Sequence, residues 1–322
     1  MNPIGAHMSI AGGLHRVFER LQAVGGECLQ LFVKPNVQWA AGDLSLEEVE
    51  WFAREQVRTG IAPVVAHASY LLNLASPDPG LRQKSGLTLA LELVRSARLG
   101  IPFLVLHPGS HQGAGEKVGL RRIAQGIDRA LARAEVPDIQ ILLETTAGAG
   151  TQLGCRLEQL RDIIGLSRSA DRLGICLDTS HVYAAGYDLS RAEAYEDFFG
   201  SFDRLISLKR LKAVHANDSK TSLGAKVDRH EQIGLGRLGI PTFERLLRDP
   251  RLSGRPFILE TPKGKQGDIP WDEINIQRLK RLREGPQPTG DQPVAPTSYQ
   301  SPRRGVPKIR SGVRDNRRRR TV

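Results

Sequence analysis

Polar side chains that follow apolar segments at a regular interval are the feature of this sequence that most restricts its fold. Six short apolar runs each end in a histidine or a carboxylate: APVVAH, PFLVLH, IQILLE, GICLD, LKAVH and PFILE. The final residues of the first five runs are 40, 37, 34 and 37 positions apart, about the length of one strand–helix unit. This spacing indicates a series of buried parallel strands, each ending in a polar side chain.

The alternation of strands and helices predicts an α/β fold, a closed (β/α)8 TIM barrel. A barrel of about 250 residues would occupy most of the 322-residue chain. A helix is expected over residues 46–59, where Ser45 and Glu48 form a capping box before Gly60 ends it. Another is expected over 81–99, with Leu87, Leu91 and Val94 at helical spacing and Gly100 as its end. The strands are expected over residues 3–7, 28–33, 62–67, 102–107, 138–144, 174–178, 212–216 and 256–260.

Nine imidazole and carboxylate side chains at these strand ends, or in the loops after them, are candidate metal ligands. In a barrel, the carboxyl ends of all strands open onto one face, so residues far apart in sequence converge there. One histidine or aspartate after a strand is usually a satisfied polar group or a helix N-cap, but nine together favour a shared site. The nine are His67, His107, Glu144, Asp178, His181, His215, Asp228, His230 and Glu260.

The chemistry of these side chains restricts the metal. The set contains no thiolate, so it suits zinc in a catalytic site, and also manganese or iron, but not a structural zinc finger. Nine ligands are too many for one tetrahedral ion, whereas three ions with one shared carboxylate fit the number. Cys28, Cys155 and Cys176 lack CxxC spacing and are interpreted as structural residues.

The positive charge of the chain is concentrated at its C-terminus. Residues 286–322 contain nine Lys or Arg and two Asp, so they carry +7 of the net +11. This stretch is rich in Pro, Gly, Ser and Gln and is predicted to be a disordered basic tail, separate from a barrel domain over residues 1–285. Two interpretations stay open: an arm that adds salt-sensitive attraction to phosphates, or an extension that only aids solubility.

Targeting signals are not recognisable in the sequence. No apolar stretch reaches the roughly 18 residues of a membrane helix, and the N-terminal MNPIGAHMSIAGG does not resemble a signal peptide. We therefore expect no membrane partner and a cytoplasmic protein, associated with the nucleoid if the source is bacterial.

Eight blocks that contain the candidate ligands occur in a fixed order. They are GAHMSIAGG (5–13), HASYLLNLA (67–75), LHPGSH (106–111), LLETTAGAGTQLG (142–154), CLDTSHVYAAGYD (176–188), HANDSK (215–220), DRHEQIGLG (228–236) and ETPKG (260–264). Over residues 3–284 the sequence resembles the endonuclease IV family, zinc-dependent apurinic/apyrimidinic endonucleases of DNA base-excision repair, which are hydrolases of the deoxyribonuclease IV type.

The resemblance implies a ligand set and a reaction. One zinc would be held by His67, His107 and Glu144, a second by Glu144, Asp178, His215 and Glu260, and a third by His181, Asp228 and His230. Glu144 would be the bridging catalytic carboxylate for a metal-bound hydroxide that attacks the phosphorus 5′ to an abasic sugar. The products would be a 3′-hydroxyl and a 5′-deoxyribose phosphate, and the partner would be double-stranded DNA with an abasic site, bound by a monomer.

The resemblance also implies loops that enter the DNA and hold the abasic nucleotide outside the stack. The matching pieces are Tyr70 and Leu71 after the third strand, and the segment 34–39 after the second, in which Asn36 and Gln38 would contact DNA. For Tyr70 and Leu71, ordinary loop packing is the alternative. The sequence departs from the family pattern at Val37, where an arginine is common, and at Leu235, where a glutamate is common.

Two other functions are compatible with parts of this pattern. A metal-dependent sugar isomerase or epimerase of the xylose-isomerase-like barrels would also place histidines and carboxylates on divalent ions, but the Asp228-Arg229-His230 element suggests a third ion. A non-catalytic DNA-binding barrel that acts through its arginine-rich tail would have no need for all nine ligands.

Overall fold

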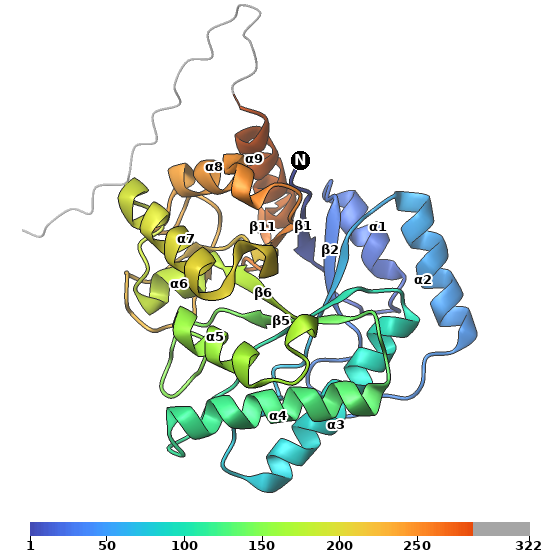
Figure 1. The fold of residues 1–322 in the computed structure, drawn as a ribbon. Helices are drawn as coiled ribbons and strands as arrows, with labels where there is room; N and C mark the ends of the chain where they lie inside the picture. The colour runs from blue at the N-terminus through green and yellow to red at the C-terminus, as the bar shows by residue number, and fades with distance from the viewer. Residues whose placement is uncertain (286–322) are drawn as a thin grey trace, which may run out of the picture. The chain divides into compact units, whose positions relative to one another are not determined.

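The eight short apolar segments form strands that close into one parallel barrel in the computed structural model, which describes residues 1–285 (Figure 1). Neighbouring strands follow the order β1-β10-β7-β6-β5-β4-β3-β2. The predicted TIM barrel is therefore confirmed, with strand ends within a residue or two of those expected. The strands are β1 (Ile4–His7), β2 (Cys28–Phe32), β3 (Val64–His67), β4 (Phe103–Leu106), β5 (Gln140–Glu144), β6 (Leu173–Asp178), β7 (Leu211–His215) and β10 (Phe257–Leu259).

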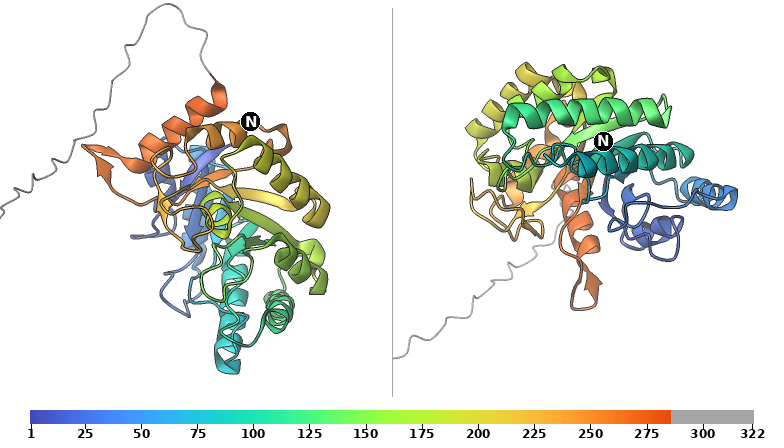
Figure 2. Two further views of the ribbon diagram at one scale, coloured as in Figure 1. Left: turned by 90° about the vertical axis from the view of Figure 1, so that its left-hand side faces the viewer. Right: turned by 90° about the horizontal axis from the view of Figure 1, so that it is seen from below.

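Helices cover the outside of the barrel (Figures 1 and 2). Helix α2 begins with the predicted capping box, in which the Ser45 and Glu48 side chains each accept a hydrogen bond from the other residue's N–H. It ends at Gly60, whose φ of 67° is left-handed. The helices are α1 (Arg16–Ala23), α2 (Leu46–Thr59), α3 (Pro79–Arg98), α4 (Glu116–Ala134), α5 (Leu157–Leu166), α6 (Thr179–Ala185), α7 (Ala192–Ile206), α8 (Ile240–Arg248) and α9 (Trp271–Glu284), with 3-10 turns η1 (Ala170–Arg172), η2 (Leu208–Arg210) and η3 (Pro250–Leu252).

Two short antiparallel pairs extend from the carboxyl ends of β7 and β10. Strand β8 (Asp218–Ser219) pairs with β9 (His230–Glu231), and β11 (Lys265–Gln266) pairs with β12 (Ile269–Pro270). Figure 2 shows the second hairpin, coloured orange, standing away from the barrel. The first pair folds the segment that contains His230 back onto the end of β7.

The buried face of α3 differs from the face suggested by its apolar residues. Leu91 and Val94 are half-buried and Leu87 is 43% exposed, whereas the buried side chains include Leu89 and Leu93. The same buried side also carries polar residues, namely Ser85, Thr88, Glu92, Arg95 and Ser96. Apolar periodicity did not reveal this face because hydrogen-bonding groups occupy much of it.

A separate apolar cluster fills the interior of the barrel. Successive side chains of a strand point to opposite faces, so one set of alternate residues faces inward while the other packs against the helices. The inner cluster consists of Cys28, Val65, Val105, Leu142, Cys176, Ala213 and Ile258, with Phe103 against it. Cys28 and Cys176 are thus core residues, as predicted, and burial raises the pKa of the Cys176 thiol to about 11.

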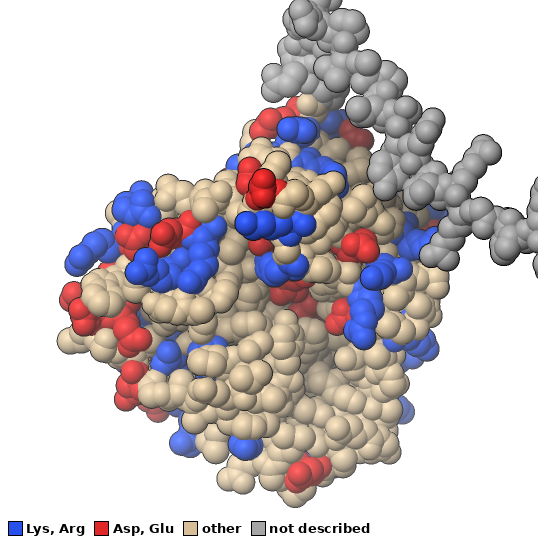
Figure 3. Space-filling view, turned by 180° about the vertical axis from the view of Figure 1, so that it is seen from behind, with Lys and Arg blue, Asp and Glu red and all other residues tan. Residues whose placement is uncertain are grey.

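Charge on the described residues is mixed. On the face seen in Figure 3, Lys and Arg lie among Asp and Glu, in keeping with a net charge of only +4 for residues 1–285. Within this range, no helix is long and apolar enough to cross a membrane. The predicted disordered tail over residues 286–322 lies outside the described residues, and the domain boundary at residue 285 stays a prediction.

Candidate metal centre

A layer of polar side chains lies directly above the apolar cluster inside the barrel. Each member follows a residue of that cluster by two positions, so it points inward from the same strand. The layer takes one side chain from each of seven strand ends: Gln30, His67, His107, Glu144, Asp178, His215 and Glu260. The apolar cluster therefore forms the floor of the site, and the carboxyl ends of the strands form its walls.

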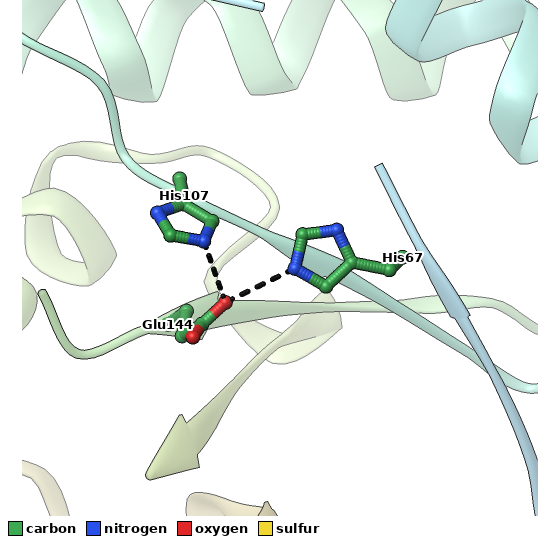
Figure 4. Close-up of side chains that lie close together, drawn as sticks. All are labelled: His67, His107 and Glu144. Carbon is green, nitrogen blue, oxygen red and sulfur yellow. Dashed lines mark hydrogen bonds and ion pairs between the residues drawn. The ribbon is translucent and has the colours of Figure 1, made fainter. Parts of the chain in front are cut away.

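The first group of potential ligands is His67, His107 and Glu144. The Nε2 atoms of His67 and His107 lie 3.2 and 3.0 Å from Glu144 Oε2, and Figure 4 shows both rings directed at that oxygen. His67 and Glu144 are buried, whereas the His107 side chain is 26% exposed. This group is therefore open to solvent on the His107 side.

The second group combines Glu144, Asp178, His215 and Glu260. His215 Nδ1 lies 3.1 Å from Glu144 Oε1, 3.2 Å from Glu260 Oε2 and 3.8 Å from Asp178 Oδ2. Glu144 thus belongs to two groups and directs a different carboxylate oxygen at each. This arrangement suits a carboxylate that bridges two ions.

The third group is Asp178, His181 and His230. Asp228 extends it, since its carboxylate oxygens lie 3.1 Å from His181 Nε2 and 3.3 Å from His230 Nε2. His181 is on α6, the helix that Asp178 caps, and His230 is on β9. All nine predicted ligands therefore meet at one mouth, with Asp178 close to both the second and the third groups.

The loop that carries Asp228 and His230 is fixed by a buried carboxylate. Asp218 accepts hydrogen bonds of 2.8 to 3.1 Å from the backbone N–H groups of Ser219, Gly234, Gly236 and Leu238. A Cβ at Gly236 would lie 2.4 Å from Asp218 Oδ1, so this approach requires glycine. Leu235, between the two glycines, is exposed, and nothing in the structure explains its departure from the family pattern.

Backbone carbonyls set the orientation of three of the histidines. Nδ1 of His67 donates to the carbonyl of Ala68 at 2.7 Å, and Nδ1 of His181 donates to that of Thr145 at 2.8 Å. Nδ1 of His230 donates to the carbonyl of Glu260 at 3.2 Å. Because a carbonyl only accepts, the proton is on Nδ1 in each neutral ring, and the Nε2 lone pair is left for a metal ion.

Gln30 and Asn217 support the ligands and were missed in the sequence. Gln30 Nε2 donates to Glu260 Oε1 at 2.6 Å, which directs its amide oxygen to His215 Nε2 at 2.8 Å. His215 therefore keeps Nδ1 free for the second group. Asn217 donates to Asp178 Oδ2 at 2.7 Å and accepts from the N–H of Glu260 at 2.8 Å. The signal for Gln30 was a lone polar residue inside the strand CLQLF.

Two carboxylates of the site stay ionised although burial disfavours their negative charge. Burial tends to raise the pKa of Glu144, but the charges of His107 and His215, with hydrogen bonds from His107 and His181, hold that pKa well below its ordinary value. The pKa of Glu260 is also lowered well below its ordinary value, because His215 outweighs burial. Buried carboxylates that stay ionised need positive charge close by. Divalent cations would supply that charge while the imidazoles stay neutral, so the residues fit a metal centre.

Of the residues predicted to contact DNA, Tyr70 lies beside this mouth, and the carbonyl of Asn36 accepts a hydrogen bond from Ser69, which precedes Tyr70. The centroid of the Tyr70 ring lies 5.3 Å from that of the His67 ring and 5.8 Å from that of the His107 ring, and Tyr70 is 59% exposed. Gln38 is also exposed, whereas Leu71 and Asn36 are half-buried. A cavity of 310 Å³ opens next to the ligands and is lined by Tyr70, Asn73, His107, Ser110, Gln152 and Asp228, among others.

Two other histidines within the sequence blocks have lesser roles. His7 is beside the site, with Nδ1 3.0 Å from Gln30 Nε2 and 3.4 Å from Glu260 Oε1. His111 accepts a hydrogen bond from the N–H of Gly115 at 3.2 Å and belongs to none of the ligand groups. These contacts agree with an interpretation of both as supporting or structural residues.

Comparison with known proteins identifies first the class of this barrel. Residues 18–285 match the family model described as "Xylose isomerase-like TIM barrel". "Probable endonuclease 4" of Chloroflexus aurantiacus is 49% identical over 285 residues, which cover 88% of this chain and 99% of that protein. "Probable endonuclease 4" of Geotalea daltonii is 46% identical over 87% of this chain and 97% of its own length.

A solved structure extends this match to three dimensions. Endonuclease IV from Thermus thermophilus superposes with a TM-score of 0.78 at 37% identity, covering 88% of this chain and 99% of its own. The chain belongs to the endonuclease IV family of DNA-repair nucleases. A D-tagatose 3-epimerase-like protein has a TM-score of 0.68 at 20% identity, and that likeness extends to the fold alone.

Proposed function

We propose that this protein hydrolyses the phosphodiester bond 5′ to an abasic site in double-stranded DNA, leaving a 3′-hydroxyl and a 5′-deoxyribose phosphate. The observation that carries the proposal is the convergence of three overlapping ligand groups at the mouth of the barrel, with Glu144 common to two of them. Because the chain belongs to the endonuclease IV family, a phosphodiester bond of DNA is the substrate bond that we propose for this centre. The similarity to epimerases is limited to the fold.

Three zinc ions would suit these donors, and manganese or iron would suit part of the centre as well. His67, His107 and Glu144 would hold the first, and Glu144, Asp178, His215 and Glu260 the second. His181, Asp228 and His230 would hold the third, with Asp178 close by. When bound, such ions lower the pKa of water towards about 7 and stabilise charge on the attacking and leaving oxygens.

The side chains of the chain itself have distinct tasks in this proposal. Glu144 is fully buried and keeps its two oxygens between different histidines. Asp228 is half-exposed at the solvent side of the third group, so an ion held there would be accessible to a phosphate of the substrate. All nine proposed ligands come from one chain, which supports the prediction that a monomer is sufficient.

Recognition of the lesion is assigned to the two segments beside the mouth. Tyr70 and Leu71 would fill the gap left by the missing base, and Asn36 and Gln38 would contact the neighbouring nucleotides. Extrusion of a nucleotide is least costly where pairing is already lost. Val37 is 75% exposed next to Asn36, so an apolar contact would replace the arginine common in the family.

The experiment is cleavage of a duplex that carries one tetrahydrofuran analogue of an abasic site. The metal-loaded protein should nick the strand 5′ to the analogue and leave a 3′-hydroxyl, whereas chelator-treated protein should not. Glu144→Gln should reduce the rate more than about 100-fold, the upper range for residues that only support ligands, and should lower the metal content.

Failure of the metal-loaded wild type to cut this duplex would contradict the proposed function. Metal-dependent epimerisation of a ketohexose by the same preparation would favour the sugar epimerase instead.

A further inference from the structure

A lysine and a glutamate form an ion pair inside the protein, between the two segments proposed to contact DNA. Lys34 Nζ lies 3.0 Å from Glu92 Oε1, and their side chains are 0% and 1% exposed. Lys34 follows strand β2 by two residues and Glu92 is on α3. Neither residue belongs to the three ligand groups, and the proposed chemistry uses neither of them.

Lys34 and Glu92 also form hydrogen bonds with backbone groups in or next to both segments. Lys34 Nζ donates to the carbonyl of Gln38 at 2.5 Å and to that of Pro35 at 3.5 Å. The two carboxylate oxygens of Glu92 accept from the backbone N–H of Ser69 at 3.2 and 3.3 Å. The pair therefore connects the backbone of residues 35–38 with the residue that precedes Tyr70.

Ser69 closes the network from the other side. Its hydroxyl donates to the carbonyl of Asn36 at 2.5 Å and accepts from the N–H of Leu71 at 3.3 Å. A single side chain thus contacts the backbone of one residue in each of the two segments. The segments are joined through their main chains, and the side chains of Tyr70 and Gln38 remain exposed.

Helix α3 holds the same loop with two further side chains. Thr88 donates to the carbonyl of Trp39 at 2.9 Å, and Arg95 donates to those of Val33, at 2.7 Å, and Gly42. Residues 88, 92 and 95 are four and three positions apart, so they lie on one face of the helix. This is the polar buried face that apolar periodicity did not predict.

Stability alone is a weak reason to bury such a pair. Replacing a buried ion pair with apolar side chains of similar volume is often neutral or stabilising, because the charges lose their hydration. Segments already held in their bound arrangement, in contrast, lose less entropy when they bind. The contacts of Lys34 and Glu92 end on the backbone of the two DNA-contacting segments, which is where such ordering would matter.

We propose that Lys34 and Glu92, with Ser69, are positioning residues that hold segments 36–38 and 70–71 in one arrangement before DNA binds. They thereby set the preference for abasic over undamaged DNA. This inference rests on the proposed function, since it assigns a role to the segments that would recognise the lesion.

The test is a double variant, Lys34→Met with Glu92→Met, which keeps the side-chain lengths and removes both charges. Its metal content and its kcat at saturating DNA should match the wild type. The ratio of Kd for an undamaged duplex to Kd for a duplex with one tetrahydrofuran site should fall about tenfold, because the segments must then be ordered on binding. KM for the abasic duplex should rise in parallel.

A matched control breaks a different ion pair at the other end of the barrel. Glu27 precedes β2 and pairs with Arg283 at 2.6 Å, so Glu27→Gln should lower the unfolding temperature and leave the Kd ratio unchanged. Ser69→Ala gives a second measurement if the double variant does not fold, because it removes the hydroxyl contact with Asn36 and should also lower the ratio.

An unchanged Kd ratio in the double variant, or in Ser69→Ala if that is the one that folds, would overturn the inference while leaving the proposed function intact. A metal-loaded wild type that does not cut the abasic duplex would instead overturn the proposed function, and this inference with it.

Discussion

Single side chains in this site each perform two tasks. Asp178 caps α6, since its Oδ1 accepts from the N–H of His181 at 2.8 Å, while its Oδ2 accepts from Asn217 at 2.7 Å and lies 3.6 Å from His230 Nε2. The ordinary helix-cap interpretation of an aspartate after a strand is therefore correct for Asp178, and its role as a metal ligand stays a prediction. Gln30 has a comparable double contact, because one amide orients both Glu260 and His215.

We expect Gln30→Leu to weaken metal binding without changing the fold. The variant removes the donor to Glu260 and the acceptor that holds the proton of His215 on Nε2, and losses of supporting contacts of this kind cost about 10- to 100-fold in metal affinity. Competition against a chelator measures the zinc Kd. Gln140→Leu is the matched control, since Gln140 begins β5 and is outside the ligand groups. Equal affinities in the two variants would contradict the role given to Gln30.

At the scale of elements, the sequence predicted the parts whose signals are local. Apolar runs that end in His or a carboxylate located the strands, and Ser45, Glu48 and Gly60 located both ends of α2. The buried face of α3 was not predictable, because Glu92 and Thr88 form contacts with a loop 49 to 58 residues earlier in the chain. Similarly, the approach of Asp178 to the third group depends on the pairing of β8 with β9, which no local pattern reveals.

Glu27, directly before β2, forms ion pairs with Lys280 and Arg283 of helix α9 and accepts a hydrogen bond from the N–H of Ile4 in β1. It therefore connects this helix with the beginning of both strands. Burial tends to raise the pKa of Glu27, but hydrogen bonds from Arg283, the N–H of Ile4 and Lys280 lower it to about 2. A lowered pKa contributes stability above the unfolded value of 4.5, and that contribution is lost as the pH falls towards 2.

We therefore expect the difference in unfolding free energy between the wild type and Glu27→Gln to shrink from about pH 6 to about pH 3. Denaturant titrations at several pH values measure this difference, and effects of acid on the histidines are common to both proteins. A difference that is constant with pH would show that the carboxylate is not ionised through these ion pairs.

In the whole molecule, most of the net positive charge and the proposed metal centre lie in different parts of the sequence. The proposed centre lies within residues 1–285, which carry +4, whereas residues 286–322 carry +7. Figure 3 shows positive and negative side chains interspersed on one face of the described part. The barrel therefore provides the selective contacts in this account, and the terminal segment could add only attraction that does not depend on sequence or lesion.

Removal of residues 286–322 should leave kcat for the abasic duplex unchanged and reduce the salt dependence of DNA binding. Each phosphate contact that is lost lowers the slope of log K against log salt by about 0.9. Binding titrations of the full chain and the truncated chain across a range of salt concentrations give the two slopes. Equal slopes would favour the interpretation of these residues as a solubilising extension.

We propose that side chains from six strand ends and two following segments together bind a cluster of metal ions. Elemental analysis of the purified protein, with its concentration determined by amino-acid analysis, measures the number of these ions. We predict close to three ions per chain, predominantly zinc, in keeping with the three ligand groups, and fewer in Glu144→Gln. A fully zinc-supplemented protein that retains one ion or none per chain would contradict the account.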